Sequence, residues 1–305
     1  GGSTGSKYAP LILYVLIFSL LAVLIKQTTR GRSFDYEPSS LVLLSEILKA
    51  AVSFAMFTIE SRLEKQPLQQ QLYHAFLHHD WKMVVPAFLY TACNLLTFSN
   101  LANYEPQTYT ILMNIKILIT ALFWSILFNK AITLRVLTSL IILTLGCALA
   151  NIDCDKLSRG ILSSFRTSHF LFVLLQATVS SLAAVCNELL LKKASPATSS
   201  SMNRSNFVLY SMSSVLNALV LSWSGAAHWM TRVTWRIACI VFLLVSGGLC
   251  TAYTLKNFSA ITKAFATSCE ILLTAMLANA LMGTRIQSCF WMSFSLIVAS
   301  LAMYN

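Results

Sequence analysis

Two apolar stretches of this chain repeat one another, and this repeat constrains the fold more than any other feature of the sequence. Residues 101–123 and 255–277 align without a gap and share asparagine, threonine and isoleucine-leucine positions. Each stretch reads as an apolar helix that carries ionisable residues, Lys116 in the first and Lys263 and Glu270 in the second. Ionisable residues inside such helices are costly and mark functional sites. A repeat of this kind is typical of a transporter with its site at the repeat interface, whereas chance similarity explains the shared asparagine and threonine poorly.

Long hydrophobic runs predict an integral membrane protein. Of the 305 residues, 56% are hydrophobic and 11% are charged, whereas a soluble domain has about 25% charged residues. A helix that crosses a bilayer needs about 20 apolar residues. We predict ten transmembrane helices, which cover residues 9–25, 38–59, 84–103, 107–127, 133–150, 169–192, 204–222, 236–256, 259–281 and 287–304.

A polar stretch at residues 151–168 divides these helices into two sets of five. An odd number of helices gives the two halves opposite membrane orientations, so we predict an all-α integral membrane fold with ten transmembrane helices as two inverted five-helix repeats. The first repeat covers residues 7–150 and the second covers residues 151–305, while residues 1–6 resemble an expression-vector remnant and are set aside. Ten Lys and Arg residues near one membrane face against nine near the other do not orient the chain.

Two pairs of opposite charges lie inside the predicted spans. Glu46 and Lys49 are three residues apart on one helix face, and Glu188 and Lys192 are four residues apart. These spacings allow each pair to neutralise itself as an internal ion pair. A role in a polar site is equally open for both pairs.

Lys116 differs from these pairs, because its own helix offers no acid within reach and has Tyr109 on the same face two turns earlier. Lys263 and Glu270 have the same spacing of seven residues. Two arrangements are open: Lys116 pairs with Glu270 as a structural latch, or Lys116 and Lys263 face a cavity and bind an anion. Lys263 also has the simpler option of extending to the membrane surface near a helix end.

The seventh predicted helix carries a polar stripe of Asn206, Tyr210 and Ser213 at helical spacing. An amide, a phenol and a hydroxyl on one stripe suit hydrogen bonding and stacking with a nucleobase or a sugar. Polar side chains of this kind also connect transmembrane helices to one another. Spacing alone favours neither interpretation, and we include all three residues among the candidate substrate contacts.

The sequence argues against several other functions. The predicted spans hold no constellation of His, Asp and Cys, so we expect no catalytic residues, no cofactor and no enzyme activity. The histidines between residues 60 and 82 lack a carboxylate or Cys partner at ligand spacing, so we expect no metal site. The eight cysteines lie mostly in apolar runs and read as buried small hydrophobic residues, Cys289 among them. The net charge of +11 comes without a basic run that includes aromatic residues, so nucleic acid is not expected as a partner.

A set of short motifs follows in order along nearly the whole chain. Residues 86–123 form the longest, and the others are S-E-I-L-K-A in the second helix, N-E-L-L-L-K in the sixth, N-F-V-L-Y in the seventh and L-K-N-F-S-A-I-T-K-A-F in the ninth. Together they resemble the nucleotide-sugar transporter family of the drug/metabolite transporter superfamily, in the branch of the CMP-sialic acid and UDP-galactose transporters. The resemblance implies the ten-helix fold of that superfamily, cytosolic termini and a location in the Golgi membrane, with the endoplasmic reticulum as a second option.

The resemblance also implies substrate-binding roles for residues already noted. Lys116 and Lys263 match the phosphate-contacting lysines of the family. Tyr109, Asn206 and Tyr210 match its nucleotide-contacting positions. These five residues are the centre of the expected binding site.

Further candidates match the family less closely. Glu46 and Lys49 match a polar pair near the sugar end of the substrate. Asn94 stands where the family has two adjacent asparagines, and Asn114 stands in place of a glutamine. Glu270 replaces a residue that is usually small. These departures fall at positions that contact the base and the sugar in the family, so they affect which substrate is bound.

The resemblance implies exchange of a cytosolic nucleotide sugar, of the pyrimidine class, for a lumenal nucleoside monophosphate by alternating access. The expected partners are these two ligands and the lipid bilayer, and a homodimer is left open. Two other functions are consistent with the sequence. One is a carrier for another organic anion with the same fold, and the other is a membrane scaffold or regulatory protein without transport activity.

Overall fold

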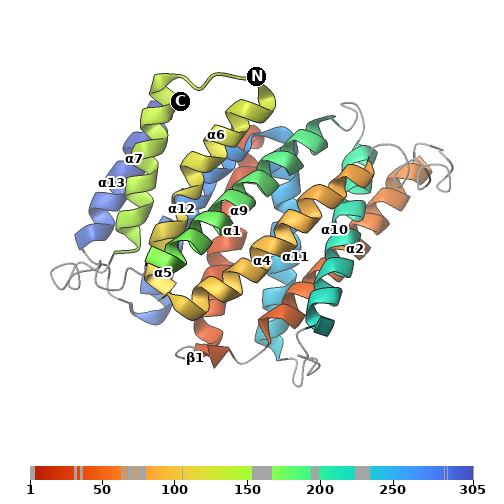
Figure 1. Cartoon of the computed structure of the whole chain (residues 1–305), viewed down its shortest axis with the longest axis horizontal. Helices are drawn as coiled ribbons and strands as arrows, with labels where there is room; N and C mark the ends of the chain where they lie inside the picture. The colour runs from red at the N-terminus through yellow and green to blue at the C-terminus, as the bar shows by residue number, and fades with distance from the viewer. Residues whose placement is uncertain are drawn as a thin grey trace. The chain divides into compact units, whose positions relative to one another are not determined.

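The structure is a computed structural model of the chain, and the residues it describes are almost entirely helical (Figure 1). These residues are 4–30, 33–34, 37–63, 65, 67, 73, 80–104, 106–152, 167–193, 199–223, 234–284, 286 and 288–304. The histidines of the polar loop after residue 63 lie outside the described residues, and so does the predicted polar stretch from residue 153 to residue 166.

The helices lie within a few residues of the predicted ranges. In chain order they are α1 (Thr4–Thr28), α2 (Pro38–Leu63), α4 (Val84–Asn103), α5 (Pro106–Met113), α6 (Lys116–Phe128), α7 (Leu134–Ala150), α9 (Thr167–Lys193), α10 (Ser199–Trp223), α11 (Trp235–Asn257), α12 (Ala260–Met282) and α13 (Ser288–Tyr304). The short 3₁₀ helix η1 (Asp80–Met83) precedes α4, and the strands β1 (Thr29–Arg30) and β2 (Ser33–Phe34) pair antiparallel after α1. α1 begins inside the segment that the sequence analysis set aside, and the helix predicted at residues 107–127 is interrupted between α5 and α6.

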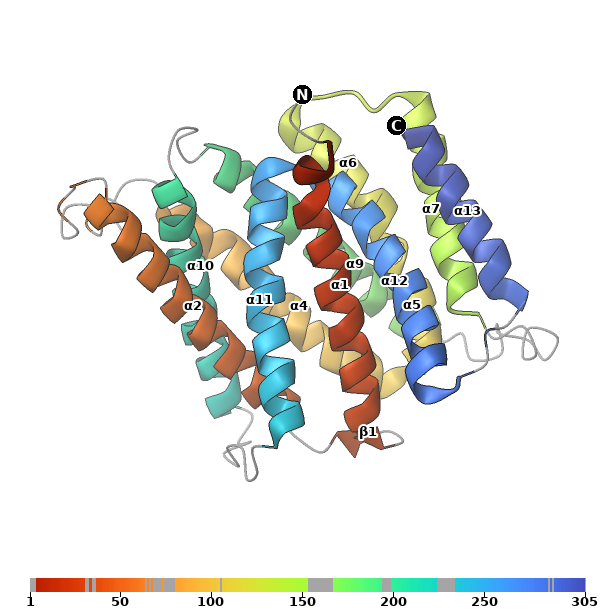
Figure 2. The same ribbon diagram turned by 180° about the vertical axis from the view of Figure 1, so that it is seen from behind.

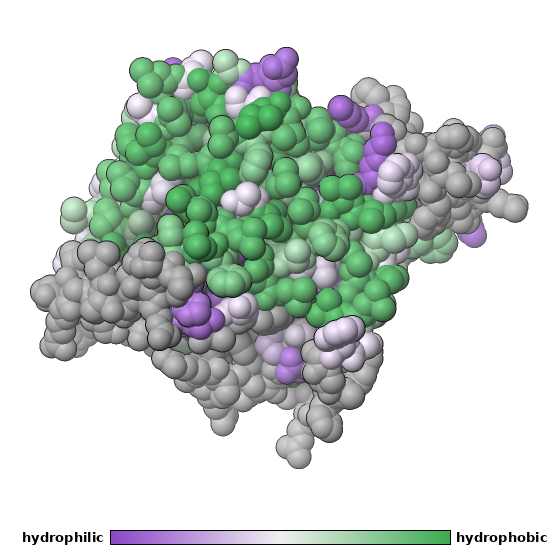
Figure 3. Space-filling view, in the orientation of Figure 1, coloured by the Kyte–Doolittle hydropathy of each residue, from purple (hydrophilic) through white to green (hydrophobic). Residues whose placement is uncertain are grey.

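Seven helical segments among the described residues are long and apolar enough to cross a membrane. They are Tyr8–Thr28, Pro38–Leu63, Thr108–Phe128, His169–Lys193, Met202–Trp223, Trp235–Asn257 and Ala260–Met282. The third combines α5 and α6, while α7 and α13 are apolar but shorter. Large apolar side chains are exposed on many of these helices, and Figure 3 shows apolar side chains over much of one described face. Such a surface suits contact with lipid tails, and these features fit a multi-pass membrane protein.

Local signals in the sequence set several helix ends. Thr133, Thr234 and Ser259 each precede a helix, and each hydroxyl accepts a hydrogen bond from the backbone N–H three residues later. Such caps satisfy one of the backbone donors that the first turn of a helix leaves without an intrahelical partner. α12 ends at Gly283, whose φ of 65° lies in the left-handed region that favours glycine.

The chain forms two compact units, and each is built from both halves of the sequence. Unit 1 consists of Gly1–Thr91 and Cys186–Phe258, and unit 2 consists of Ala92–Val185 and Ser259–Asn305. Two of the three unit boundaries fall inside α4 and α9, so these two helices contribute to both units, and the third lies between α11 and α12. The predicted repeats concern internal symmetry, which this division into units does not test.

In unit 1, α2 packs against α10 and α11, and α1 packs against α11 (Figures 1 and 2). Leu21, Leu41 and Ile240 belong to one buried apolar cluster of this unit. Close packing depends on a small residue, because a Cβ built on Gly247 would lie 2.9 Å from a ring carbon of Phe18. Small residues at helix contacts are the usual means of close approach in membrane proteins.

In unit 2, α7 packs against α13, and α12 packs against α6, α7 and α13 (Figure 2). Ser300 donates to the backbone carbonyl of Ser139 at 2.6 Å, and Ser293 donates to that of Gly146 at 2.8 Å. The contact between α6 and α12 brings parts of the two repeated stretches together, as a site at the repeat interface requires. A twofold relation between them stays a prediction.

Cys289, at the start of α13, is disulfide-bonded, which the interpretation of the cysteines as buried small hydrophobic residues did not include. Six other cysteines of the described residues are free, namely Cys93, Cys147, Cys186, Cys239, Cys250 and Cys269. The apolar run around Cys289 predicted burial correctly, since its side chain is 7% exposed. It held no signal for pairing, because a disulfide joins residues whose separation along the chain is set by the fold.

Candidate functional site

The helix that carries Lys116 is interrupted immediately before this residue. α5 ends at Met113 and α6 begins at Lys116. Between them, the N–H groups of Asn114 and Ile115 donate to carbonyls three residues earlier, each at 3.2 Å, whereas an α-helix uses a spacing of four. Asparagine competes with helical backbone hydrogen bonds more than an apolar residue does. The interruption makes Lys116 the first residue of a new helix inside a segment long enough to span the membrane.

Lys116, Lys263 and Glu270 form a group of charges in unit 2, on the two helices α6 and α12 that pack together. Lys116 interacts electrostatically with Lys263, which repels it, and with Glu270, which attracts it. All three side chains are half-buried. Both arrangements that the sequence left open are partly present. The attraction between Lys116 and Glu270 corresponds to the latch, and the proximity of Lys116 to Lys263 corresponds to the anion site. Two ammonium groups and one carboxylate leave one positive charge without compensation inside the group.

Ser181 on α9 holds the start of α6. Its Oγ donates to the backbone carbonyl of Lys116 at 3.1 Å and accepts from Thr120 Oγ1 at 3.0 Å. Ser181 and Thr120 are both buried. Polar groups need protein partners in an apolar environment, so these bonds fix the backbone that carries Lys116. Sequence reasoning missed Ser181, because a lone serine in an apolar helix has no distinctive spacing.

Tyr109 on α5 is held by Gln176 on α9. Gln176 Nε2 donates to the Tyr109 hydroxyl at 2.7 Å and to Thr97 Oγ1 at 2.6 Å. Gln176 Oε1 accepts from Asn100 Nδ2 at 2.7 Å. Gln176 is 2% exposed, so a buried amide connects α4, α5 and α9. Sequence reasoning found Tyr109 but missed Gln176, because the two partners are 67 positions apart.

Asn94 and Asn114 are the other candidates in unit 2. Asn94 is half-buried on α4. Asn114 is 6% exposed, and its Nδ2 has no hydrogen-bond partner among the residues that the structure describes. Buried polar groups in proteins are nearly always paired. An open amide donor two residues before Lys116 is therefore a candidate ligand contact.

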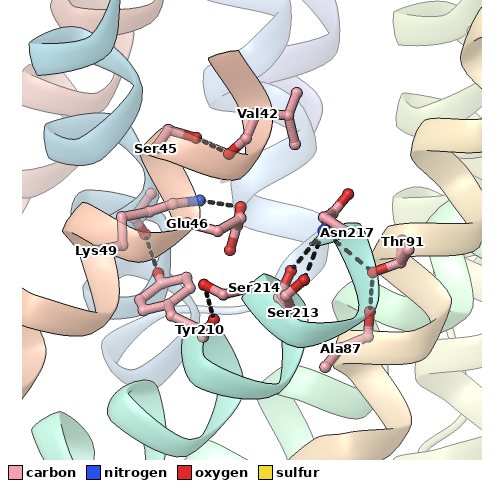
Figure 4. A network of polar contacts seen from close by, with 11 residues as sticks. Val42, Ser45, Glu46, Lys49, Ala87, Thr91, Tyr210, Ser213, Ser214 and Asn217 are labelled. Carbon is pink, nitrogen blue, oxygen red and sulfur yellow. Dashed lines mark hydrogen bonds and ion pairs between the residues drawn. The ribbon is translucent and has the colours of Figure 1, made fainter. Parts of the chain in front are cut away.

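Glu46, Lys49 and Tyr210 form one connected group in unit 1 (Figure 4). Lys49 Nζ pairs with Glu46 Oε1 on α2, which confirms the predicted ion pair. The same ammonium group lies 4.8 Å from the centre of the Tyr210 ring on α10, which is a cation–π geometry. The Tyr210 hydroxyl donates to the backbone carbonyl of Gly248 on α11 at 3.0 Å. Three helices thus fix the position of the lysine.

Gly248 makes room for this lysine. A Cβ built on Gly248 would lie 2.5 Å from Lys49 Cδ. The missing side chain therefore lets the stem of Lys49 pass close to α11, while the carbonyl of the same residue holds Tyr210. The sequence offered a weak signal, a pair of glycines at 247–248 inside an apolar helix.

Ser213 has a partner that the sequence analysis did not identify. Asn217, one turn later on α10, donates through Nδ2 to the Ser213 carbonyl at 2.8 Å and to Ser213 Oγ at 3.2 Å (Figure 4). The same nitrogen lies 3.3 Å from Thr91 Oγ1 on α4. Asn217 thus connects α10 to α4, whereas its two bonds to Ser213 lie within α10. A contact with substrate stays a prediction.

Asn206 is the candidate residue with the most side-chain polar atoms that have no hydrogen-bond partner among the described residues. Its side chain is 1% exposed, and within the described part of the chain neither Nδ2 nor Oδ1 has a partner. Asn187 Oδ1 on α9, in the same unit, is open in the same sense. Each unpaired buried polar group costs about 1–3 kcal/mol. Such a set of open groups suits a polar molecule that completes their hydrogen bonds.

Unit 1 contains two further ion pairs among the described residues. Lys192 pairs with the fully buried Glu188 at 2.6 Å, so the second predicted pair is confirmed. Near the start of α10, Arg204 Nε and Ser205 Oγ donate to the two carboxylate oxygens of Asp80, at 2.6 and 2.7 Å. Asp80 is 2% exposed, and its pairing joins η1 to α10.

The ten predicted site residues divide equally between the units. Unit 1 contains Glu46, Lys49, Asn206, Tyr210 and Ser213, and unit 2 contains Asn94, Tyr109, Asn114, Lys116 and Lys263. A cation–π contact joins Lys49 to Tyr210, and Lys116 and Lys263 lie near enough for their charges to repel each other. In the residues the structure describes, no group of three or more His, Cys, Asp or Glu side chains is suited to hold a metal ion.

The chain is similar over its whole length to known transporters. A model of the nucleotide-sugar transporter family matches residues 3–305. The chain is 27% identical to the UDP-galactose transporter senju of Drosophila melanogaster, over 96% of this chain and 84% of that protein. It is 27% identical to the UDP-N-acetylglucosamine transporter of Canis lupus familiaris (99% and 96% covered) and 24% identical to CMP-sialic acid transporter 1 of Oryza sativa subsp. japonica (95% and 94%). A solved crystal structure at 14% identity has a TM-score of 0.72 over 99% of this chain and 97% of that chain, and so shares the fold.

These relatives bear the names of transporters, which confirms the expectation that the protein is not an enzyme. The helical architecture of the described residues, with seven apolar segments of spanning length among them, agrees with a membrane carrier. Because the family model matches nearly every residue, this protein belongs to the nucleotide-sugar transporter family.

Proposed function

We propose that the protein is an antiporter that exchanges a cytosolic pyrimidine nucleotide sugar for a lumenal nucleoside monophosphate in the Golgi membrane. The observation that carries this proposal is the interaction of Lys116 with Lys263, two like charges held together in a unit of apolar helices. Charge inside a spanning helix is costly, and Glu270 offsets only one of the two lysines. A phosphate group between the ammonium groups removes their repulsion, since lysine binds phosphate as a point charge.

Neighbouring groups of unit 2 suit the same ligand. The open Nδ2 of Asn114 is a donor for a phosphate or ribose oxygen. The hydroxyl of Tyr109 is held in place by Gln176. A site that combines positive charge with fixed donors matches the chemistry of a nucleotide phosphate.

Unit 1 supplies groups that suit a base and a sugar. Asn206 offers a buried donor and a buried acceptor, which is the pattern that a pyrimidine edge complements. Glu46 and Lys49 offer a charged pair that suits sugar hydroxyls. The relatives are named for UDP-galactose, UDP-N-acetylglucosamine and CMP-sialic acid, all of which contain a pyrimidine, and this supports the same class for the present chain.

The proposed mechanism is alternating access in a fold of ten spanning helices, arranged as the inverted repeats 7–150 and 151–305. The interruption between α5 and α6 supports it, because discontinuous helices carry the substrate sites of many secondary transporters. The matching stretches at residues 101–123 and 255–277 support the internal repeat.

The disulfide at Cys289 supports an orientation that the charge distribution does not provide. Disulfides persist in oxidising compartments such as the secretory lumen and are rare in the cytosol. Cys289 is the second residue of α13. We therefore assign the start of α13 to the lumen and its end, at Tyr304, to the cytosol, which agrees with cytosolic termini.

Exchange in proteoliposomes tests the proposed function. Vesicles with the purified protein are loaded with UMP, CMP, GMP or AMP, and uptake of labelled UDP-galactose, UDP-N-acetylglucosamine or CMP-sialic acid is measured. We expect uptake with UMP or CMP inside, and none without internal nucleotide. Faster uptake with GMP or AMP would contradict the pyrimidine class. Absence of exchange with every pair would contradict antiport and favour the scaffold function.

A further inference from the structure

Ser53 is a fully buried serine of α2 whose hydroxyl group has no hydrogen-bond partner among the residues that the structure describes. A serine or threonine inside a helix commonly donates to a carbonyl of its own preceding turn. Ser45, Thr58 and Ser61 of the same helix do so, each at 2.8 Å. The hydroxyl group of Ser53 makes no such bond, so one donor and one acceptor group stay open inside unit 1.

Three contacts fix the register of α2 against α10. The contacts pair Glu60 with Asn203 by a hydrogen bond of 2.8 Å, Phe54 with Phe207 at 5.0 Å between ring centres, and Lys49 with Tyr210 at 4.8 Å (Figure 4). The residue number rises along one helix as it falls along the other, so the two helices run antiparallel. This register places Ser53 opposite residues 206–210 of α10.

Asn206 lies in that range and is also buried and open. Ser53 is one helical turn after Lys49, and Asn206 is one turn before Tyr210, so the antiparallel packing brings both residues to the same level. In the described part of the chain, the Ser53 hydroxyl group and both ends of the Asn206 amide lack a partner, and they do not bond to each other. Two open polar side chains at one level of a helix pair suit a polar group that binds to both.

We propose that Ser53 binds the pyrimidine base of the nucleotide together with Asn206. This inference rests on the proposed function, since it adds a residue to the base site proposed there. A serine hydroxyl group both donates and accepts, and it rotates to suit its partner. It can donate to O4 of uracil or accept from the N4 amino group of cytosine, the exocyclic groups in which the two bases differ. Ser53 is thus a contact that admits both pyrimidines.

A purely structural serine predicts different behaviour. Small side chains let helices approach each other closely, and in that case Ser53 only fills space between α2 and α10. Ser53→Ala would then leave nucleotide affinity unchanged, because alanine is also small. A base contact instead predicts a loss of affinity in a variant whose nucleotide-free form is at least as stable as the wild type.

The experiment compares Ser53→Ala with Ser40→Ala. Ser40 is the matched control, because it is a buried serine of the same helix whose hydroxyl group also lacks a partner among the described residues. It lies 13 positions earlier, which corresponds to about 20 Å along the helix axis. Calorimetry measures the binding of UMP and of CMP to the detergent-purified protein. Competition against UMP measures the binding of ribose 5-phosphate, which has the sugar and the phosphate but no base.

We expect Ser53→Ala to weaken the binding of UMP and of CMP each by roughly threefold to tenfold, as for one lost hydrogen bond. Its affinity for ribose 5-phosphate should stay within about twofold of the wild type, and Ser40→Ala should keep all three affinities within the same limit. Neither substitution should lower the melting temperature of the nucleotide-free protein, because each removes a buried hydroxyl group that has no partner in the described residues.

Several results would overturn the inference. Wild-type affinity for UMP and CMP in Ser53→Ala would show that the serine only fills space, and an equal loss for ribose 5-phosphate would show that the contact is not with the base. An equal loss in Ser40→Ala would reveal a general effect on α2. If Ser53→Ala does not fold, Ser53→Cys, with its weaker donor, is tested with the same ligands and the same expected direction. A wild-type protein that binds neither UMP nor CMP would contradict the proposed function itself, which is a separate outcome.

Discussion

The ammonium group of Lys49 lies 4.8 Å from the centre of the Tyr210 ring, while the hydroxyl of the same tyrosine donates to the carbonyl of Gly248. The sequence suggested Lys49 and Tyr210 as separate substrate contacts on two helices. In the structure they belong to one arrangement, in which Glu46 neutralises the lysine and Gly248 leaves space for its stem. A change at the glycine therefore affects the lysine, although the two residues are far apart in the sequence.

Gly248→Ala should disturb this arrangement. The added methyl group would meet Lys49 Cδ at 2.5 Å, so the lysine must leave its position over Tyr210. We expect a loss of about 1–3 kcal/mol in the free energy of unfolding. We also expect the affinity for the nucleotide sugar to fall more than the affinity for the nucleoside monophosphate. Gly247→Ala is the control, because its clash is with Phe18 at 2.9 Å and not with Lys49. Equal binding losses in the two variants would argue against a role of Lys49 in sugar binding.

Lys116→Ala and Lys263→Ala should each weaken nucleotide binding strongly while the protein stays monodisperse. A hydrogen bond to a charged group contributes about 1.5–3 kcal/mol, so the expected loss is roughly tenfold to 150-fold in affinity for UMP or CMP. Lys130→Ala is the control, because Lys130 is an exposed lysine just after α6. The measurement is calorimetry together with size-exclusion chromatography. Wild-type affinity in either folded variant would remove that lysine from the phosphate site.

Glu270→Gln should strengthen nucleotide binding. The carboxylate attracts Lys116 and so competes with a phosphate for the same ammonium group. Without this competition we expect affinity for UMP or CMP to rise by about tenfold, which corresponds to about 1.4 kcal/mol. The gain should disappear in a Lys116→Ala background. Weaker binding in Glu270→Gln would instead support the latch, in which Glu270 holds Lys116 in its productive position.

Asp80→Asn should destabilise unit 1 without a direct effect on nucleotide affinity. The buried carboxylate accepts from Arg204 and Ser205, and the substitution leaves the guanidinium without its ion-pair partner at that place. We expect a loss of about 2–4 kcal/mol in the free energy of unfolding, visible as a lower melting temperature. Glu37→Gln, at an exposed carboxylate before α2, should leave the melting temperature unchanged. A variant Asp80→Asn as stable as the wild type would show that Arg204 finds another partner.

The sequence proposed most residues of the candidate site, but it did not predict their geometry. Lys116 and Lys263 stood out because charge is rare in apolar helices, and Glu46 with Lys49 stood out because a spacing of three places two side chains on one helix face. Gln176 and Gly248 did not stand out. A buried glutamine and a glycine inside apolar helices acquire their roles from what other helices bring near them.

The sequence by itself determined the elements, because their causes are local. Apolar runs of spanning length give the helices, the hydroxyls of Thr133, Thr234 and Ser259 cap three of them, and each hydrogen bond closes within a few residues. Only the tertiary structure decided which polar groups are satisfied and which stay open. Gln176 satisfies Tyr109 from 67 positions away, whereas both polar atoms of Asn206 stay without a partner among the described residues. Whether a polar group is satisfied depends on the distances between helices, and these distances cannot be predicted from the residue pattern along one helix.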